Sequence, residues 1–318
     1  KEIRNAQNEK YRQDLLNVYK ILGFTDNRQA AALQAGFFND FVHTALLRAA
    51  LIRALSSATS PMSETELLAA LQKALGVDKV FESGSQTSYN LRDCVLSNPD
   101  AKGNLLRKAA DAMRFYLGFS LITEQRYGWR RNNPNLEQLD VLHISYQDIE
   151  DVAEESIIAQ EFPAWRNLAP TSRVKILSTV FDTMRSKLCI SCDYLDHTKQ
   201  EDYLKDLWSR LKPLWTLPKE RLSGSKFKGN HISFSKKKKD KFDSKTQRSV
   251  SLSPSSSMAK ELRKCLDETD DAEFWKENFQ KRDYSDLVLC ILKAAEEYGI
   301  VEKRHDDTWV LDSGALRW

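Results

Sequence analysis

The sequence lacks the short motifs that mark most common active sites. It contains no Gly-x-x-x-x-Gly-Lys-Ser/Thr phosphate loop, no His-Glu-x-x-His, no Gly-x-Ser-x-Gly and no Gly-x-Gly-x-x-Gly. The five histidines are scattered, without the spacing of metal ligands. No apolar run approaches the roughly 18 residues that a membrane span needs, so we expect no membrane partner. These absences disfavour an autonomous enzyme.

Cysteine is also sparse. The five cysteines form an odd, scattered set, whereas small secreted scaffolds carry a dense, even number, so we expect a cytoplasmic location. No methionine precedes Met62 and no leader sequence opens the chain, which indicates an excerpt of a longer protein. Cys189-Ile-Ser-Cys192, with His197 downstream, has a metal-like spacing. A zinc site would need further ligands, and two buried thiols one helical turn apart are the alternative.

The composition is that of a folded chain with an uneven distribution of charge. The 318 residues are 41% hydrophobic and 29% charged, with a formal net charge of +3. Residues 218–249 carry eleven basic and three acidic residues, or +8, which leaves −5 for the rest. This asymmetry hints at a polyanionic partner. Within it, Lys236–Lys239 is either a phosphate-binding run or a solvated tether, and the absence of an aromatic platform favours the tether.

The first part of the chain predicts a strand followed by a helix. Residues 18–24 form a short apolar run, and Asp26 is a plausible N-cap for the helix that follows. Apolar residues then recur at helical spacing from Arg28 to Leu55, where Gly36 divides the pattern into two helices. A strand that runs directly into a helix is half of a βαβ unit.

Most of the remaining chain has helical patterns. Ser63 and Glu66 form a capping box that opens a helix ending at Gly76, and residues 83–104 are predicted to be a loop. Further helices are expected at 104–119, 147–162, 170–195, 200–214, 258–278 and 284–298, and strands at 300–304 and 308–311. A helix followed at once by a small hairpin is typical of a winged helix.

A basic and aromatic turn lies between residues 125 and 138. Arg126, Arg130 and Arg131 supply guanidinium groups that neutralise phosphates, and Trp129 is suited to stacking on an unpaired base. In the alternative interpretation, the Trp129 side chain is buried in the hydrophobic core and the arginines pair with Glu137 or other nearby acids. Composition alone leaves both interpretations open.

Two segments together resemble one family. Residues 20–41 resemble motif IV and its following helix, and residues 126–142, with Gly-Trp-Arg and Pro-Asn-Leu-Glu-Gln-Leu, resemble a second signature. The family is the large bacterial superfamily-two DEAD/DEAH-type helicases of anti-phage defence, the group of the Druantia helicase subunit. The two motifs and the segment between them cover the first half of the chain. Ala30, Phe37 and Asp140 stand where the family pattern has Asp, His and Gly.

The resemblance implies a specific role for the first segment. The strand at 18–24 would belong to a second RecA-like lobe, with Thr25, Asn27 and Arg28 at its carboxyl end, where this helicase class faces the nucleic-acid backbone. The ATP-binding lysine, the Asp-Glu pair and the arginine finger would lie outside this chain. ATP and magnesium therefore belong to the parent protein, and we expect no catalytic residue and no metal here.

The expected fold is mainly α, with a strand-helix piece of a RecA-like α/β lobe followed by a helical insert that ends in a winged-helix-like unit. The predicted parts are the lobe piece (1–58), a helical insert with the basic turn (59–165), a helical segment (166–222), a basic Ser/Lys-rich linker without regular structure (223–258) and the winged-helix-like module (259–318).

The sequence therefore predicts a fragment of an ATP-dependent DNA helicase or translocase that contacts or steers DNA. The candidate nucleic-acid-binding residues are Thr25, Asn27, Arg28, Arg126, Trp129, Arg130 and Arg131. DNA, the rest of the helicase polypeptide and other defence-system subunits are the expected partners. The alternative is a non-catalytic winged-helix scaffold that docks a partner subunit and touches no nucleic acid.

Overall fold

The computed structural model is mainly helical, and it describes residues 28–82, 89–125, 134–217, 231–235, 247–251, 253–280, 283–304 and 308–318. The chain divides into two compact units, residues 1–48 and 49–318. In the first unit, all described residues belong to helix α3 (Arg28–Ser56), which continues into the second unit. The predicted strand at 18–24 and the cap at Asp26 lie outside the described residues.

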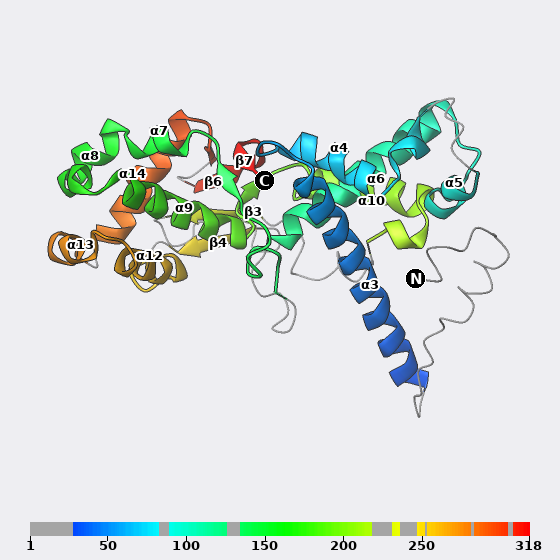
Figure 1. The fold of residues 1–318 in the computed structure, drawn as a ribbon, viewed down its shortest axis with the longest axis horizontal. Helices are drawn as coiled ribbons and strands as arrows, with labels where there is room; N and C mark the ends of the chain where they lie inside the picture. Colours follow the sequence, from blue (N-terminus) through cyan, green and yellow to red (C-terminus); the bar gives the residue numbers. More distant parts are fainter. Residues whose placement is uncertain are drawn as a thin grey trace. The chain divides into compact units, whose positions relative to one another are not determined.

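Helix α3 runs for 29 residues without interruption, so the prediction that Gly36 divides it is wrong (Figure 1). One glycine in a helix interior costs only about 1 kcal/mol relative to alanine. The flanking stretches are rich in alanine, leucine and glutamine, which favour helix strongly enough to offset that cost.

The second unit contains a first group of helices that comprises α4 (Glu64–Ala74), α5 (Tyr89–Val95), α6 (Gly103–Glu124) and α10 (His197–Arg210). The capping box of α4 is confirmed, because the Ser63 backbone N–H donates to Glu66 Oε2 at 2.8 Å and the Glu66 N–H donates to Ser63 Oγ. Gly76 ends this helix with φ at +71°. Helix α5 falls within the predicted loop at 83–104, so the structure differs from the prediction there.

Aromatic side chains join α6 to α10 and to the segment that leads into it. The Phe115 ring stacks on Tyr203 with 4.9 Å between ring centroids, and Tyr194 lies against Phe115 at 5.8 Å. Gly118 faces the Tyr194 ring so closely that a Cβ atom there would lie 2.2 Å from Tyr194 Cζ. Only glycine therefore allows α6 and Tyr194 to approach to this distance.

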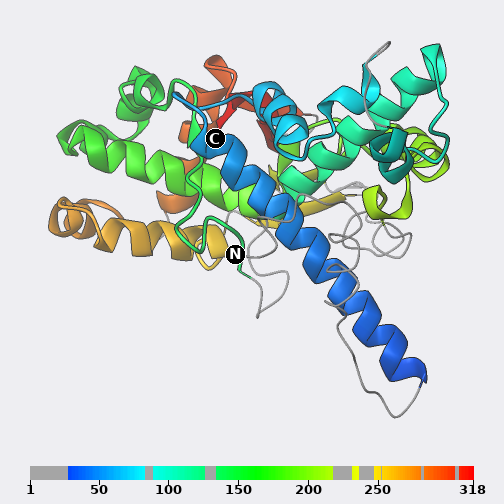
Figure 2. The ribbon, with the colours of Figure 1, turned by 45° about the vertical axis from the view of Figure 1, so that its right-hand side comes forward.

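The second group of helices comprises α7 (Ile149–Ala153), α8 (Ser156–Glu161), α9 (Pro170–Ser186), α12 (Ser257–Asp267), α13 (Ala272–Asn278) and α14 (Tyr284–Glu297). Helix α9 packs against α12 and α7, and α14 packs against α8 (Figures 1 and 2). Trp165 is buried between these elements and donates from Nε1 to the Ala153 carbonyl at 3.0 Å. Apolar side chains of α9 and α14, such as Phe181 and Ile291, form the core of this group.

Helix α9 ends at Ser186 rather than at the predicted residue 195. Leu188 adopts φ of +58°, its N–H donates to the Arg185 carbonyl, and the Cys189 N–H donates to the Met184 carbonyl at 2.9 Å. These two bonds form a Schellman motif, in which glycine normally occupies the left-handed position. Leucine at this position gives no signal of a helix end, so the pattern predicted a longer helix.

A sheet built around strand β6 (Thr308–Asp312) completes the second unit. Its other strands are β2 (Ile190–Ser191), β3 (His231–Ser235), β4 (Gln247–Ser251) and β5 (Val301–Arg304). Strand β6 pairs antiparallel with β5 and β3 and parallel with β2, while β3 and β4 are parallel. A separate pair joins β1 (Ser145–Tyr146) to β7 (Leu316–Arg317). Strands β3 and β4 lie within the predicted linker at 223–258, which is therefore wrong for these ten residues.

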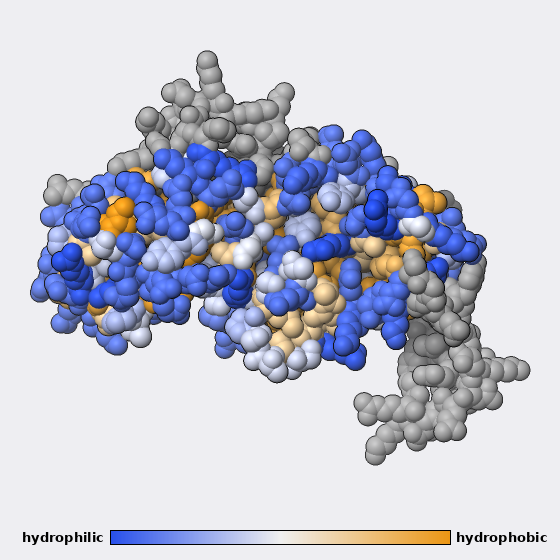
Figure 3. Space-filling model, turned by 90° about the horizontal axis from the view of Figure 1, so that it is seen from above, coloured by the Kyte–Doolittle hydropathy of each residue, from blue (hydrophilic) through white to orange (hydrophobic). Residues whose placement is uncertain are grey.

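The predicted helix and hairpin at the end of the chain are confirmed as elements. Helix α14 ends before Gly299, which has φ of +69°, and β5 and β6 pair with Val301 opposite Leu311. The classification of this unit as a winged helix stays a prediction. The face of the molecule in Figure 3 is mostly hydrophilic, with apolar residues showing between the polar ones.

We expect Gly118→Ala to destabilise the chain, although the same change in an open helix usually stabilises by up to about 1 kcal/mol. The added methyl group meets the Tyr194 ring, so the free energy of unfolding should fall by about 1–3 kcal/mol in urea denaturation. In a Tyr194→Ala background the same substitution should become neutral or stabilising. Equal or greater stability of Gly118→Ala in the wild-type background would contradict the close packing.

Candidate nucleic-acid interface

The sequence-predicted site residues lie mostly beyond the described part of the chain. Thr25, Asn27 and residues 126–133, which include Arg126, Trp129, Arg130 and Arg131, are outside the described residues. Arg28 is the first residue of α3, and its backbone alone is described. The structure does describe both ends of the basic turn, which are the last residues of α6 and the segment from residue 134 to 142.

Two amide side chains organise the segment that follows the basic turn. The Gln138 N–H donates to Asn135 Oδ1 at 2.7 Å, and the Asn135 N–H donates to Gln138 Oε1 at 3.0 Å. This reciprocal pair resembles a capping box and holds one helical turn in place. The Asn135 side chain also donates from Nδ2 to the Gln125 carbonyl at 3.4 Å. The two ends of the basic turn are therefore hydrogen-bonded to each other.

Asp140 closes this helical turn in the left-handed region, with φ of +56°. The Val141 N–H donates back to the Leu136 carbonyl at 3.0 Å across it. A backbone in this region favours glycine, and aspartate is one of the few other residues that tolerate it. The glycine that the family pattern places here would suit this conformation, and Asp140 keeps the same backbone course at a small cost.

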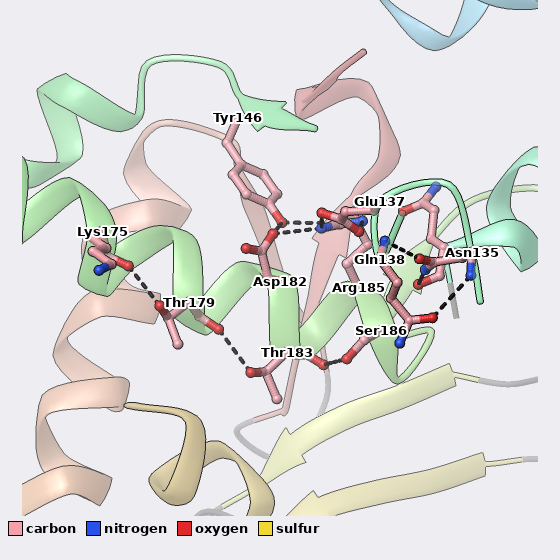
Figure 4. A network of polar contacts seen from close by, with 11 residues as sticks. Asn135, Glu137, Gln138, Tyr146, Lys175, Thr179, Asp182, Thr183, Arg185 and Ser186 are labelled. Atoms are coloured by element: carbon pink, nitrogen blue, oxygen red, sulfur yellow. Dashed lines mark hydrogen bonds and ion pairs between the residues drawn. The ribbon is translucent and has the colours of Figure 1, made fainter. Parts of the chain in front are cut away.

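A buried arginine anchors the segment to α9 (Figure 4). Arg185 has an exposed side-chain fraction of 1% and forms a bidentate pair with Glu137, from Nη1 to Oε2 at 2.8 Å and from Nη2 to Oε1 at 2.5 Å. Its Nη2 also donates to Asp182 Oδ1 at 2.7 Å. Its Nε donates to the Tyr146 hydroxyl at 3.1 Å, and that hydroxyl donates to Asp182 at 2.7 Å. We call these four residues the Arg185 cluster.

The electrostatics of the Arg185 cluster keep Tyr146 and Arg185 each in one protonation state. Burial raises the pKa of Tyr146 well above its ordinary value, so the hydroxyl remains protonated and can donate to Asp182. Burial lowers the pKa of Arg185, but its contacts with Tyr146, Glu137 and Asp182 outweigh this effect and raise it overall. A planar guanidinium satisfies three partners at once, which a lysine ammonium cannot do with the same geometry.

The Arg185 cluster also bears on the alternative interpretation of the basic turn. That interpretation paired the turn's arginines with Glu137 or with other nearby acids, and Glu137 is the closest of these on the C-terminal side. Both carboxylate oxygens of Glu137 instead accept hydrogen bonds from Arg185. Sequence reasoning missed Arg185, because its partner lies 48 residues away and nothing local marks it as buried.

The cysteine motif does not form a metal site in the described part of the chain. Cys189 precedes β2 and Cys192 follows it, so the prediction that they lie one helical turn apart is wrong. Burial raises the pKa of the Cys189 thiol, and it raises that of Cys192 to about 12. Among the described residues, no three His, Cys, Asp or Glu side chains are grouped to hold a metal. Cys189 is buried and Cys192 is partly exposed, and their raised pKa values disfavour the thiolate form that reacts.

A polar cavity of about 680 Å3 lies among α4, α6, β5 and the segment from β2 to α10. Two ion pairs lie in its lining, Lys199 with Asp193 at 2.6 Å and Arg304 with Glu302 at 3.5 Å. The lining comes from five separate stretches of sequence, so no local motif predicts it. These pairs are largely exposed to solvent and assign the cavity no chemistry.

Comparisons with protein-family models, with curated proteins and with solved structures find no match for this chain. None of the helices in the described part of the chain combines the length and apolar content that crossing a bilayer requires.

Replacing Arg185 tests the cluster. We expect Arg185→Lys to lower the free energy of unfolding by about 2–4 kcal/mol, because a lysine ammonium in this buried position cannot bond Glu137, Asp182 and Tyr146 with the geometry of the guanidinium. The matched control is Arg210→Lys, which changes an arginine paired with Asp206 within one helix at 2.6 Å and should cost less than about 1 kcal/mol. If both variants lose the same free energy of unfolding in urea denaturation, the Arg185 cluster contributes no more to stability than an ion pair within one helix.

Proposed function

We propose that this chain is part of an ATP-dependent DNA helicase or translocase of anti-phage defence, in which it contacts or steers a DNA strand. The observation that carries the proposal is that Glu137, one of the acids to which the alternative interpretation assigned the turn's arginines, accepts hydrogen bonds from Arg185 at both carboxylate oxygens. In this proposal Arg126, Arg130 and Arg131 are the groups that neutralise the phosphates of the strand.

The fixed ends of the basic turn support this function. Residues 125 and 135 are hydrogen-bonded to each other, and residue 137 is tied to α9 through Arg185. Fixing the ends of a short segment lowers the entropy that it loses on binding, so more of the contact energy appears as affinity. Three arginines and Trp129 in such a segment provide phosphate neutralisation and base stacking together. Single-stranded DNA is the partner that uses both.

The resemblance to motif IV adds the enzymatic part of the proposal. In that reading Thr25, Asn27 and Arg28 contact the strand at the edge of a RecA-like lobe, while ATP and magnesium bind elsewhere in the parent protein. The rest of the helicase polypeptide and other defence-system subunits are the proposed protein partners. In the full-length protein, replacing both Arg28 and Arg130 with alanine would then lower DNA-stimulated ATP hydrolysis.

One observation favours the second candidate, a protein-docking scaffold. Residues Thr308 to Leu311 of β6 are all buried, and the strand is covered on both edges by β5, β2 and β3. A hairpin whose inner strand is buried in this way packs within the protein and does not present that strand to a groove of DNA. In this candidate the terminal unit docks a partner subunit, and the basic turn is a surface loop.

Binding of a short single-stranded oligonucleotide separates the two candidates. We expect the variant with Arg126, Arg130 and Arg131 all changed to alanine to lose at least about tenfold in affinity and about 2 units of the slope against log salt. The control changes Lys236–Lys239 to alanine, which removes more charge and should alter affinity by about twofold or less if that run is a tether.

The opposite ranking would locate binding in the lysine run instead of the basic turn. Binding by the wild-type chain that does not weaken as salt rises would contradict phosphate contacts and favour the scaffold.

A further inference from the structure

The polar cavity contains charged groups beyond its two ion pairs. It lies beside α6, which packs against both α4 and α10 (Figure 1). Five acidic and three basic side chains line it, so the lining has a formal charge of −2. Besides the two pairs, the charged residues of the lining are Glu64, Asp111, Arg114 and Asp196. The volume of about 680 Å3 lies within the usual range for small-molecule sites.

Asp111 and Arg114 stand one turn apart on α6, and both line the cavity. This spacing usually brings opposite charges together on a helix. Here the two side chains do not pair, and the Asp111 carboxylate has no hydrogen bond or ion pair to any residue that the structure describes. Arg114 makes one hydrogen bond at the limit of distance, from Nη2 to Thr65 Oγ1 at 3.5 Å. The cavity therefore offers a ligand both a carboxylate and a guanidinium.

We propose that this cavity binds a free amino acid with a cationic side chain, such as arginine. An amino acid carries an ammonium and a carboxylate on the same carbon atom, and Asp111 and Arg114 complement these two groups. A guanidinium can bind a carboxylate through two parallel hydrogen bonds, and Arg114 has N–H donors left for them. This site goes beyond the proposed nucleic-acid contact and does not depend on it.

The rest of the lining selects the side chain of the amino acid. The zwitterionic head adds no net charge, so the lining keeps its charge of −2 and attracts a cation. The Tyr203 ring also lines the cavity, and it stacks on Phe115 with 4.9 Å between ring centroids. A guanidinium stacks on an aromatic face and pairs with carboxylates such as Glu64, which favours arginine. The same negative charge disfavours a phosphate.

Titration calorimetry on the full chain tests the site with four probes. L-arginine carries all three charged groups, Nα-acetyl-L-arginine lacks the ammonium, agmatine lacks the carboxylate, and L-citrulline lacks the charge of the side chain. We expect L-arginine to bind about tenfold more tightly than each of the other three, because each of them loses one charged hydrogen-bonding group.

Two variants assign the two contacts of the head group. Asp111 and Arg114 are both exposed, so the variants should keep the fold. We expect Asp111→Asn to bind L-arginine about tenfold more weakly and to leave the affinity for Nα-acetyl-L-arginine unchanged. Arg114→Gln should weaken L-arginine by the same factor and leave agmatine unchanged. The control Asp202→Asn changes an exposed acid of α10 outside the lining and should alter none of these affinities.

The proposal fails if wild type shows no saturable binding of L-arginine, or if L-citrulline binds as tightly. An equal loss of L-arginine and Nα-acetyl-L-arginine in Asp111→Asn would mean that this carboxylate does not contact the ammonium, and it would overturn the assignment. The same holds for agmatine in Arg114→Gln. A loss in Asp202→Asn equal to that in Asp111→Asn would attribute the effect to surface charge alone and would also overturn the site.

Discussion

The ion pair between Arg185 and Glu137 joins parts of the chain that are far apart in sequence, and the site depends on it. One guanidinium holds a turn through Glu137, its own helix through Asp182 and strand β1 through Tyr146. Removing it would leave the carboxylates of Glu137 and Asp182 and the Tyr146 hydroxyl without the guanidinium that joins them. This arginine therefore fixes the segment that follows the basic turn to α9.

Features set by a few neighbouring residues were predictable from the sequence. The capping box at Ser63 and Glu66, the helix end at Gly76 and the terminal helix with its hairpin after Gly299 all form as the residues indicate. In each case the chemistry is local, since a side chain caps its own helix or a glycine adopts a conformation that other residues avoid. The mainly helical character follows from the same apolar periodicity.

Features set by distant contacts were not predictable. Leu188 ends α9 in a left-handed backbone conformation that favours glycine. The chain then pairs β2 with β6, a contact between residues far apart in sequence that the local pattern does not reveal. Strands β3 and β4 lie in a segment dominated by lysine and serine, and their place depends on the pairing of Phe234 with Trp309. The site shows the same division: the motif around Glu137 was visible in the sequence, but its partner 48 residues later was not.

The central claim is that the Arg185 cluster positions the basic turn for a nucleic-acid strand. A double-mutant cycle on oligonucleotide affinity tests it most directly, with Glu137→Gln made in the wild-type chain and in a chain whose loop arginines are alanine. The account predicts that Glu137→Gln weakens binding in the first background and has no further effect in the second, while the protein stays folded in both. Equal effects in the two backgrounds, or no effect in either, would contradict it.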